Sequence, residues 1–187
     1  MIREEIILKH AAGKDLLDIG CMGRTNKYKL WPQVKAVART YTGIDVQIPS
    51  SPDVVQGNME TYAFDQDFDV IIAGDVLEHV SNQGLFLDNI RRHLRNNGLL
   101  ILTTPNAKWP TVFLSPHPDH VLWHDRSTLT GLMGRHGLEV RHFQYYYGNK
   151  PHYSFFKRIL AKRQGLLMIC EKALSRTGPD GLTSKDI

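Results

Sequence analysis

A short apolar segment that ends in an acid and a glycine-containing turn, DLLDIGCMGR at Asp15–Arg24, constrains the fold of this chain more than any other feature. The apolar run predicts a buried strand, and the glycines predict a tight turn that leads into a helix. A second run ends in GID at Gly43–Asp45, with Asp45 25 residues after Gly20. Backbone N–H groups at a helix N-terminus bind polar or anionic groups, and an acid that closes the next strand can accept hydrogen bonds from ribose hydroxyls. Together the two segments predict a pocket for a nucleoside-containing cofactor.

Apolar runs and helical patterns alternate along the chain. FDVIIAG at Phe68–Gly74 and LLILTTP at Leu99–Pro105 are continuous apolar runs, typical of strands that are buried on both faces. This alternation predicts an α/β fold: a doubly wound, mainly parallel, seven-stranded sheet with helices on both faces. The last two strands lack a full helix-length crossover, so an antiparallel last strand is expected. The expected strands are 15–19, 41–46, 54–55, 68–74, 99–105, 138–147 and 165–173. The expected helices are 3–12, part of 28–40, 83–95 and 125–136, with 106–124 irregular and 153–163 helical or irregular.

Length and composition limit the organisation of the chain. With 187 residues, of which 42% are hydrophobic, residues 1–173 are expected to form a single domain and the polar residues 174–187 a flexible tail. The two cysteines, Cys21 and Cys170, have neither a metal-ligand spacing nor a disulfide framework, which favours a reducing compartment. No signal peptide opens the sequence and no apolar run approaches the ~20 residues of a membrane span, so we expect a cytoplasmic protein without a membrane span.

Basic residues gather near the end of the chain. The net charge is +4, and the segment KRILAKRQ at Lys157–Gln164 carries much of the excess. A basic, partly apolar segment can contact nucleic acid or an anionic membrane surface, but no interleaved aromatic residues accompany this run. We interpret it as a solvated helix face, and nucleic acid is not the expected partner.

Five motifs occur in order along the chain: DLLDIGCMGR, GIDV, GNMET, FDVIIAGDVLEHV and LRNNGLLILTTPN. Together they resemble class I S-adenosylmethionine-dependent methyltransferases of the small-molecule type with LEHV and TPN signatures. The resemblance covers residues 13–172 and implies a Rossmann-like methyltransferase domain with S-adenosylmethionine as its cofactor. The first turn departs from the family's acid-x-Gly-x-Gly-x-Gly pattern, because Met22 and Arg24 stand at the second and third glycine positions.

The resemblance also implies which residues line the cofactor site. Asp18 would accept a hydrogen bond from the ammonium group, Gly20 would let the chain pass under the methionine part, and Asp45 would bind the ribose. The segment Asn58–Glu60 would flank the adenine, with Met59 either against its ring or in the core. An ordinary turn without a ligand is the alternative for the first motif. The full expected set is Asp18, Gly20, Cys21, Met22, Gly23, Asp45, Val46, Asn58, Met59, Glu60, Gly74, Asp75 and Val76.

Histidines lie near the expected cofactor site. His79 is the candidate general base, because imidazole titrates near neutral pH; a structural role in holding a loop is the alternative. Asp75, Glu78 and His79 could also hold Mg²⁺, Mn²⁺ or Zn²⁺ with a further histidine, although we expect no metal in the site. The further candidates are His117, His120 and His124. They belong to the segment Trp109–Asp125, which we interpret as the acceptor pocket or, alternatively, as a packed surface loop.

The reaction implied by the resemblance is transfer of a methyl group to a small-molecule or glycan acceptor, with oxygen as the favoured atom. A cofactor-binding protein without catalysis, a metal-assisted methyltransferase and an RNA-directed one stay open. A nicotinamide-dependent oxidoreductase would need Gly-x-Gly-x-x-Gly, which GCMGRT at 20–25 does not supply. GDVL follows the fourth strand in place of the Asn/Asp-Pro-Pro-aromatic run of enzymes that methylate base amino groups. Few residues precede the first strand, so we expect an open cofactor site that residues 106–124, or a partner subunit in a homodimer, would close.

Overall fold

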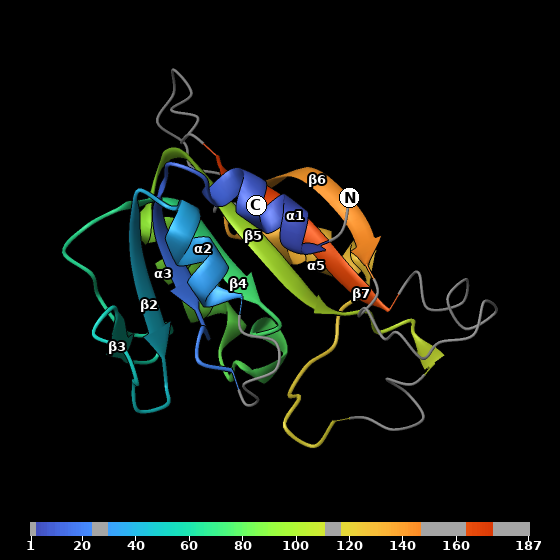
Figure 1. The fold of residues 1–187 in the computed structure, drawn as a ribbon. Helices are drawn as coiled ribbons and strands as arrows, with labels where there is room; N and C mark the ends of the chain where they lie inside the picture. Colours follow the sequence, from blue (N-terminus) through green and yellow to red (C-terminus); the bar gives the residue numbers. More distant parts are fainter. Residues whose placement is uncertain (1–2, 24–29, 111–116, 147–163, 174–187) are drawn as a thin grey trace, which may run out of the picture.

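Seven strands form one sheet. The computed structural model describes residues 3–23, 30–110, 117–146 and 164–173. The strand order is β3-β2-β1-β4-β5-β7-β6, and all neighbouring pairs are parallel except those of β7, which runs antiparallel to both β5 and β6 (Figure 1). The strands are β1 (Asp15–Ile19), β2 (Thr40–Asp45), β3 (Val54–Gln56), β4 (Phe68–Gly74), β5 (Leu94–Pro105), β6 (Leu138–Tyr146) and β7 (Gly165–Lys172). The expected mainly parallel, seven-stranded sheet with an antiparallel last strand is confirmed.

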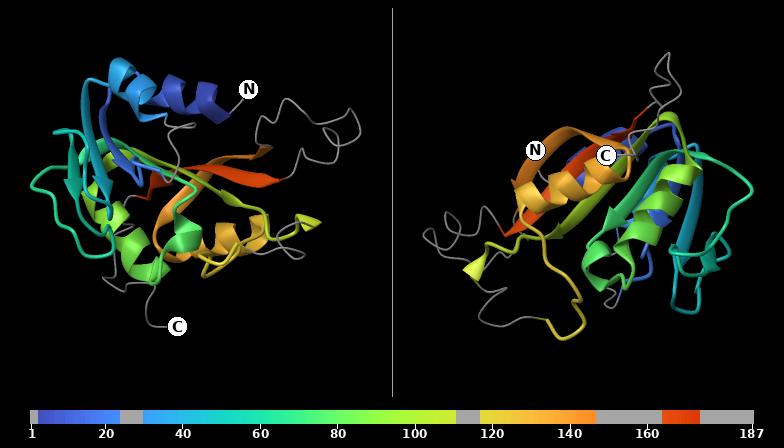
Figure 2. Two further views of the ribbon diagram at one scale, coloured as in Figure 1. Left: turned by 60° about the horizontal axis from the view of Figure 1, so that its bottom comes forward. Right: turned by 180° about the vertical axis from the view of Figure 1, so that it is seen from behind.

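Helices cover both faces of the sheet (Figures 1 and 2). On one face lie α1 (Arg3–Ala11) and α2 (Trp31–Val37), and on the other α3 (Gln83–His93) and α5 (Arg126–Arg135). Successive strand side chains point to opposite faces, so the central strands contribute to two apolar clusters. The cluster under α1 and α2 includes Ile6, Ile7, Val34, Leu16, Val70 and Ile101. The cluster under α3 and α5 includes Phe86, Ile90, Leu129, Leu17, Ile71 and Leu100. These two layers make the domain doubly wound, as expected.

Capping residues determine where helices α3 and α5 begin and where α5 ends. The Asn82 side chain accepts a hydrogen bond from the backbone N–H of Leu85 at the start of α3. At the start of α5, Asp125 and Thr128 form a reciprocal capping box, which confirms Asp125 as the expected cap. Gly137, with φ 63°, ends the α5 segment as expected.

The start of β5 differs from the sequence-based expectation. β5 begins at Leu94, directly after α3, because Leu94 pairs with Phe68 before the register shifts and Leu99 pairs with Val70. Asn97 in the intervening bend has φ 61°, a conformation that asparagine adopts more readily than most residues. α2 occupies part of residues 28–40, as expected, and Pro32 lies in its first turn, where its missing N–H has no cost. The predictions for 153–163 and for the tail 174–187 concern parts of the chain outside the described residues.

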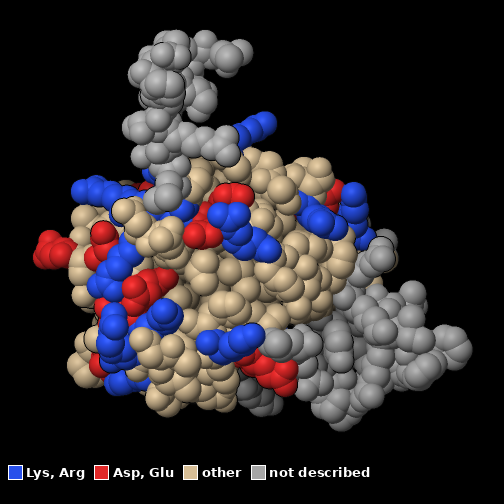
Figure 3. All heavy atoms as spheres, turned by 90° about the horizontal axis from the view of Figure 1, so that it is seen from above, with Lys and Arg blue, Asp and Glu red and all other residues tan. Residues whose placement is uncertain are grey.

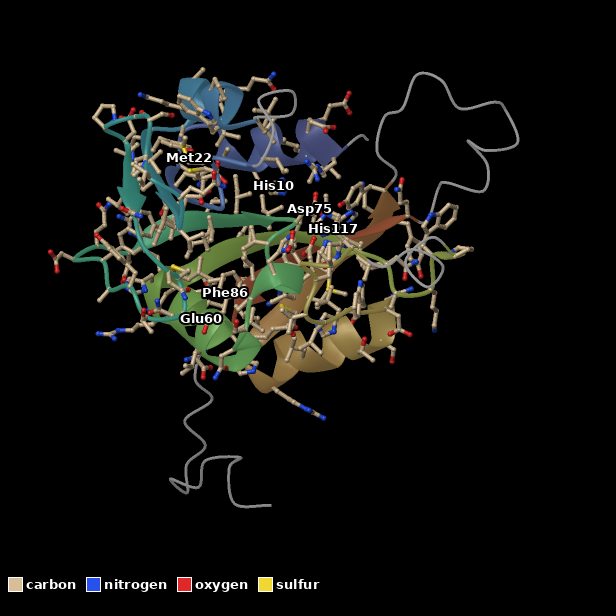
Figure 4. The ribbon with its side chains drawn as sticks, turned by 90° about the horizontal axis from the view of Figure 1, so that it is seen from below. His10, Met22, Glu60, Asp75, Phe86 and His117 are labelled. Carbon is tan, nitrogen blue, oxygen red and sulfur yellow. The ribbon has the colours of Figure 1, made fainter. Side chains whose placement is uncertain are left out.

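The carboxyl ends of the parallel strands meet at one edge of the sheet, the lower edge in Figure 1. Figure 4 views the sheet from this side and labels Met22, Glu60, Asp75 and His117. Ligands of such open sheets bind outside the carboxyl ends of the strands, where the strand order reverses. The strand order here reverses between β1 and β4. None of the described helices has the length and apolar character needed to cross a bilayer.

Candidate functional site

The turn after β1 is built on Gly20. Its φ is 71°, and its N–H donates a hydrogen bond to the Ile44 carbonyl at 2.8 Å. A Cβ at this position would lie 2.5 Å from Val76 Cγ2, closer than carbon atoms approach. Glycine is therefore required twice, for its conformation and for the close approach of the β4 turn. The end of β1 and the end of β4 are in contact here.

Asp45 ties the first turn to the end of β2. Its carboxylate accepts hydrogen bonds from the backbone N–H of Met22 (2.9 Å, at Oδ2) and from that of Gln47 (3.0 Å, at Oδ1). The residue is buried, with 6% of its surface exposed. Each carboxylate oxygen keeps further acceptor capacity, so the same group can also receive hydroxyl donors. Asp45 thus has a structural role in this turn that the sequence pattern does not reveal.

Asp18 is a buried acid beside this turn. Its only described side-chain partner is the Tyr41 hydroxyl, which donates to Oδ2 at 3.1 Å. Burial raises the pKa of the Asp18 carboxyl to about 7; the Tyr41 hydrogen bond acts against this shift and the charge of Asp45 adds to it. No described lysine or arginine forms an ion pair with Asp18 or Asp45. The ends of β1 and β2 therefore hold two buried acids whose partners are neutral.

Met22, which replaces a family glycine, lies in a small apolar cluster. Cys21, Met22 and Val54 are buried together, and Trp31 packs against them. Burial raises the pKa of the Cys21 thiol to about 12, so the thiol stays protonated. Gly23 has φ 55° and open space around it, so only its backbone conformation requires glycine. The turn is thus built around Asp45 and an apolar contact instead of around three glycines.

The segment after β3 forms a compact turn next to Asp45. Asn58 Oδ1 accepts from the backbone N–H of Glu60 at 2.9 Å, and Glu60 Oε1 accepts from the backbone N–H of Ser81 at 3.2 Å. Met59 is 3% exposed and belongs to the large core cluster, which favours the core interpretation of this side chain. Val46, in contrast, is 67% exposed. The side chains of Asn58 and Glu60 therefore organise this loop in the free protein.

Asp75 follows Gly74 at the end of β4, with φ 54°. Its N–H donates to the Thr103 carbonyl at 2.9 Å, and its carboxylate accepts from Arg3 Nη1 at 2.5 Å and from the Tyr146 hydroxyl at 2.6 Å. Arg3 and Tyr146 lie 72 and 71 residues away from Asp75 along the chain. Sequence reasoning missed Arg3 and Tyr146, because no local pattern links them to Asp75.

The 3-10 helix η2 (Leu77–His79) carries Glu78 and His79, and the side chain of His120 lies close to both. One ligand atom from each lies within 4.8 Å of the others. Glu78 is 1% exposed and accepts from the Thr104 hydroxyl at 3.0 Å. Burial raises the pKa of the Glu78 carboxyl to about 8, and the Asp75 charge adds to the shift. The structure therefore brings together part of the metal-ligand set that the sequence suggested.

The hydrogen bond of His79 fixes its tautomer. His79 Nδ1 lies 3.0 Å from the Asp119 carbonyl, and a carbonyl oxygen only accepts, so Nδ1 carries the proton. In the neutral ring the lone pair is then on Nε2. His117 stacks on His120 with ring centroids 4.8 Å apart, and burial lowers the pKa of His120, as do the neighbouring imidazoles. His124 is separate, since its Nε2 is bonded to Gln83 Oε1 at 2.8 Å.

Part of the expected acceptor segment lies beside this cluster. Residues 111–116 are outside the described residues, but the N–H of Val121 donates to the Glu78 carbonyl at 2.7 Å. The side chains of Val121, Leu122 and Trp123 are exposed. A surface hollow of about 450 Å³ lies elsewhere, and no expected cofactor residue lines it. Its lining residues are Lys108, Arg126, Ser127, Thr130 and Tyr145.

Comparisons with known proteins agree with this geometry. A ubiquinone biosynthesis O-methyltransferase of Rickettsia akari (strain Hartford) is 28% identical over 107 residues, which are 52% of this chain and 43% of that protein. The mitochondrial enzyme of the same name from Schizosaccharomyces pombe is 29% identical over 122 residues, 57% of this chain and 44% of that protein. The chain therefore spans less than half of the length of these curated relatives.

A solved structure shares the fold. The N-methyltransferase NodS from Bradyrhizobium japonicum WM9, in complex with S-adenosyl-L-homocysteine, superposes with a TM-score of 0.63 at 16% identity, covering 91% of this chain and 85% of that one. This likeness confirms the Rossmann-like methyltransferase fold, and the bound product agrees with S-adenosylmethionine as the cofactor of such proteins. A family model described as a methyltransferase domain matches residues 2–143, more than half of the sequence. The chain therefore belongs to this methyltransferase family.

Proposed function

We propose that this chain transfers a methyl group from S-adenosylmethionine to an oxygen atom of a small-molecule acceptor, glycan units included. The observation that carries the proposal is the pair of buried acids, Asp18 and Asp45, beside the Gly20 turn, with only neutral partners among the described residues. A buried carboxylate is costly unless a positive group or several donors compensate it. S-adenosylmethionine brings an ammonium, a sulfonium and ribose hydroxyls to this edge.

Each expected cofactor residue has a place in this proposal. Asp45 accepts the ribose hydroxyls with its remaining lone pairs, and Asp18 faces the ammonium group. Glu60 and Asn58 hold the loop that flanks the adenine, while Met59 supports this loop from the core. The remaining members of the set form the walls of the cleft through their backbone and small side chains: Gly20, Cys21, Met22, Gly23, Val46, Gly74, Asp75 and Val76.

The chemistry needs orientation more than acid–base help. The acceptor oxygen attacks the methyl carbon, the carbon–sulfur bond breaks, and its electron pair goes to the sulfur. The acceptor proton passes to a base, for which the Nε2 lone pair of neutral His79 is available at the protein surface. The O-methyltransferase names of the relatives support oxygen as the acceptor atom.

Calorimetric titration tests the proposal directly. We expect S-adenosylmethionine and S-adenosylhomocysteine to bind with one site per chain, and NADH to give no heat. Incubation with radiolabelled cofactor and a panel of phenols, sugars, amines and RNA then identifies the acceptor class. A folded chain that binds neither sulfur compound contradicts the proposal. Binding without turnover on the whole panel would favour the non-catalytic alternative instead, and transfer to amines or RNA alone would exclude oxygen of a small molecule.

A metal-assisted version of the reaction is the second candidate, favoured by Glu78, His79 and His120. His79 donates its other ring N–H to a carbonyl, and Thr104 donates to Glu78, as the outer partners of metal ligands commonly do. One carboxylate with two imidazoles suits Mn²⁺ or Zn²⁺. A bound cation would orient the acceptor oxygen and lower its pKa.

Titration with MnCl₂ or ZnCl₂ alone tests this candidate without any acceptor. We expect one bound ion per chain, at least tenfold weaker binding in His120→Ala, and no change in His142→Ala, which removes an exposed histidine of β6. Equal binding in the wild type and His120→Ala would assign the ion to another place and remove the candidate.

A further inference from the structure

The turn after β4 is held in a strained conformation. Asp75 has φ 54°, in the left-handed region that non-glycine residues rarely adopt. Such a conformation is energetically unfavourable and persists only where the surroundings fix it. Its side chain is 39% exposed, so burial alone does not impose the conformation. Specific partners must therefore stabilise it.

Three elements supply these partners. Thr103 of β5 accepts the Asp75 N–H with both its carbonyl and its hydroxyl oxygen, at 2.9 and 3.1 Å. Arg3 of α1 and Tyr146 of β6 each donate to one oxygen of the Asp75 carboxylate, at 2.5 and 2.6 Å. Arg3 and Tyr146 also contact one another, because the guanidinium carbon lies 5.3 Å from the centroid of the tyrosine ring. The Thr103 hydroxyl also lies 3.2 Å from Oδ1 of Asp75 and can donate to it, so a cation and two hydroxyls hold the carboxylate.

The electrostatics agree with this geometry. Arg3 is largely buried, with 22% of its side chain exposed. Burial works against its charge, yet Asp75 and Tyr146 raise the pKa of Arg3 above its ordinary value. Burial and the Asp75 charge likewise raise the pKa of the Tyr146 hydroxyl well above its usual range, so this group stays a donor. Both donors therefore carry their protons at neutral pH.

The clamped turn bears on the cofactor turn. Val76 follows Asp75 directly, and its Cγ2 occupies the space that a Cβ on Gly20 would need, 2.5 Å from that position. A shift in the conformation of Asp75 would move Val76 and change the distance between Val76 and Gly20. Positions that are fixed to a fraction of an ångström matter in a site of this kind, because misplacement of about 1 Å can cost about a hundredfold in activity.

We propose that Arg3 and Tyr146 are positioning residues for the cofactor, which act through Asp75 and Val76 on the turn at Gly20. The inference rests on the proposed function, because the ligand whose binding they control is S-adenosylmethionine. Neither residue needs to touch the cofactor. Helix α1 is accordingly part of the binding machinery, and not only a cover for the apolar face of the sheet.

Calorimetry with S-adenosylmethionine and with S-adenosylhomocysteine tests the proposal on the full chain. Arg3→Met removes the cation and keeps a long apolar side chain, Tyr146→Phe removes one hydroxyl, and Arg3→Lys restores the charge. Arg39→Met is the matched control, since Arg39 forms two ion pairs at the opposite edge of the sheet. Thermal unfolding of each variant shows that it is folded at the temperature of the titration.

We expect a dissociation constant raised about tenfold or more in Arg3→Met, a smaller rise in Tyr146→Phe, recovery to within about threefold in Arg3→Lys, and no change in Arg39→Met. Folded Arg3→Met with wild-type affinity would overturn the inference. So would an equal loss in Arg39→Met, which would indicate general destabilisation. If the wild type itself binds neither compound, the proposed function fails; if the wild type binds and only these variants disagree, the positioning role fails alone.

Discussion

The acids at the two ends of the parallel strands differ in the partners of their carboxylates. At the amino ends, Asp15 of β1 and Asp69 of β4 each pair with two arginines, Arg39 and Arg95, at 2.6 to 3.1 Å. Figure 3 looks onto this edge, where basic and acidic side chains lie next to one another. The hydrogen bond from Arg39, followed by that from Arg95, holds the pKa of Asp15 below its usual range.

At the carboxyl ends the acids lack such partners. The Asp18 carboxylate accepts a hydrogen bond from one hydroxyl, and the Asp45 carboxylate accepts hydrogen bonds from two backbone N–H groups. Burial raises the pKa of Asp18 to about 7 and that of Glu78 to about 8. Among the described residues, Asp75 is the acid of this edge that pairs with an arginine, and it holds a strained turn. The amino edge thus has matched charges that stabilise the free protein, while Asp18 and Asp45 at the carboxyl edge have neutral described partners, which fits the proposed binding of a cationic cofactor with hydroxyl groups.

A pair of glycines gives the largest expected contrast between the edges. Gly13, between α1 and β1, and Gly20 both have positive φ, 69° and 71°. An alanine is strained by about 1–2 kcal/mol at either position, but only at Gly20 does its Cβ also collide, with Val76. We expect Gly20→Ala to weaken S-adenosylmethionine binding by about a hundredfold or more, and Gly13→Ala to lower stability without changing binding. Calorimetry with both variants decides, and similar affinities would show that the Gly20 contact is irrelevant to the site.

The next largest expected difference is in cofactor affinity, between Asp45→Ala at the carboxyl edge and Asp15→Ala at the amino edge. Asp45→Ala leaves the N–H groups of Met22 and Gln47 without their acceptor and removes the proposed ribose partner. We expect cofactor affinity to fall by about 10–100-fold, the size of a lost charged hydrogen bond. Asp15→Ala is the control, and its effect should be confined to thermal stability. Unchanged affinity in Asp45→Ala would remove this residue from the site.

The stabilisation that the acids provide changes with pH in opposite directions at the two edges. The folded pKa of Asp18, about 7, is above its ordinary value, so its contribution is fully present below about pH 4 and is lost as the pH rises through 7. Asp18→Asn keeps an acceptor for Tyr41 but cannot ionise. We expect the variant to gain stability relative to the wild type between about pH 4 and pH 7, measured by urea unfolding. A constant difference across this range would mean that Asp18 is not protonated on folding.

The sequence predicted the sheet and the residues at its carboxyl edge because both depend on local patterns. Apolar runs in the sequence predict buried strands. An acid or glycine at the end of such a run lies at the edge of the sheet where that strand ends. The parallel part of the sheet followed from the alternation of strands and helices, and the antiparallel last strand from the lack of a full helix-length crossover between the last two strands. The start of β5 at Leu94 was not predicted, because Asn97 and Gly98 are typical of a helix stop and the pairing of Leu94 with Phe68 of β4 is not local.

The contacts that organise the site were beyond a single sequence for the same reason. Arg3 and Tyr146 lie 72 and 71 residues from Asp75 along the chain, and Tyr41 reaches Asp18 from the neighbouring strand β2. A lone arginine in a short helix has no local signal for such a role. Met59 shows the converse, because its place in a motif suggested the cofactor whereas its burial places it in the core.

The smallest expected effect belongs to the amino edge. Arg95→Met removes one of the two cations that pair with Asp15 and Asp69. These arginine contacts and, for Asp69, the Asp15 N–H lower the pKa of both acids, although partial burial of Asp69 acts against the shift. Their stabilisation is therefore present above about pH 4 and is lost as the pH falls through the lowered values, the reverse of Asp18. We expect Arg95→Met to lower the melting temperature slightly at pH 7, less at high salt, and to leave cofactor affinity intact. Arg92→Met removes the same charge from α3 outside this cluster, and an equal loss there would show that net charge, and not pairing, distinguishes the amino edge from the carboxyl edge.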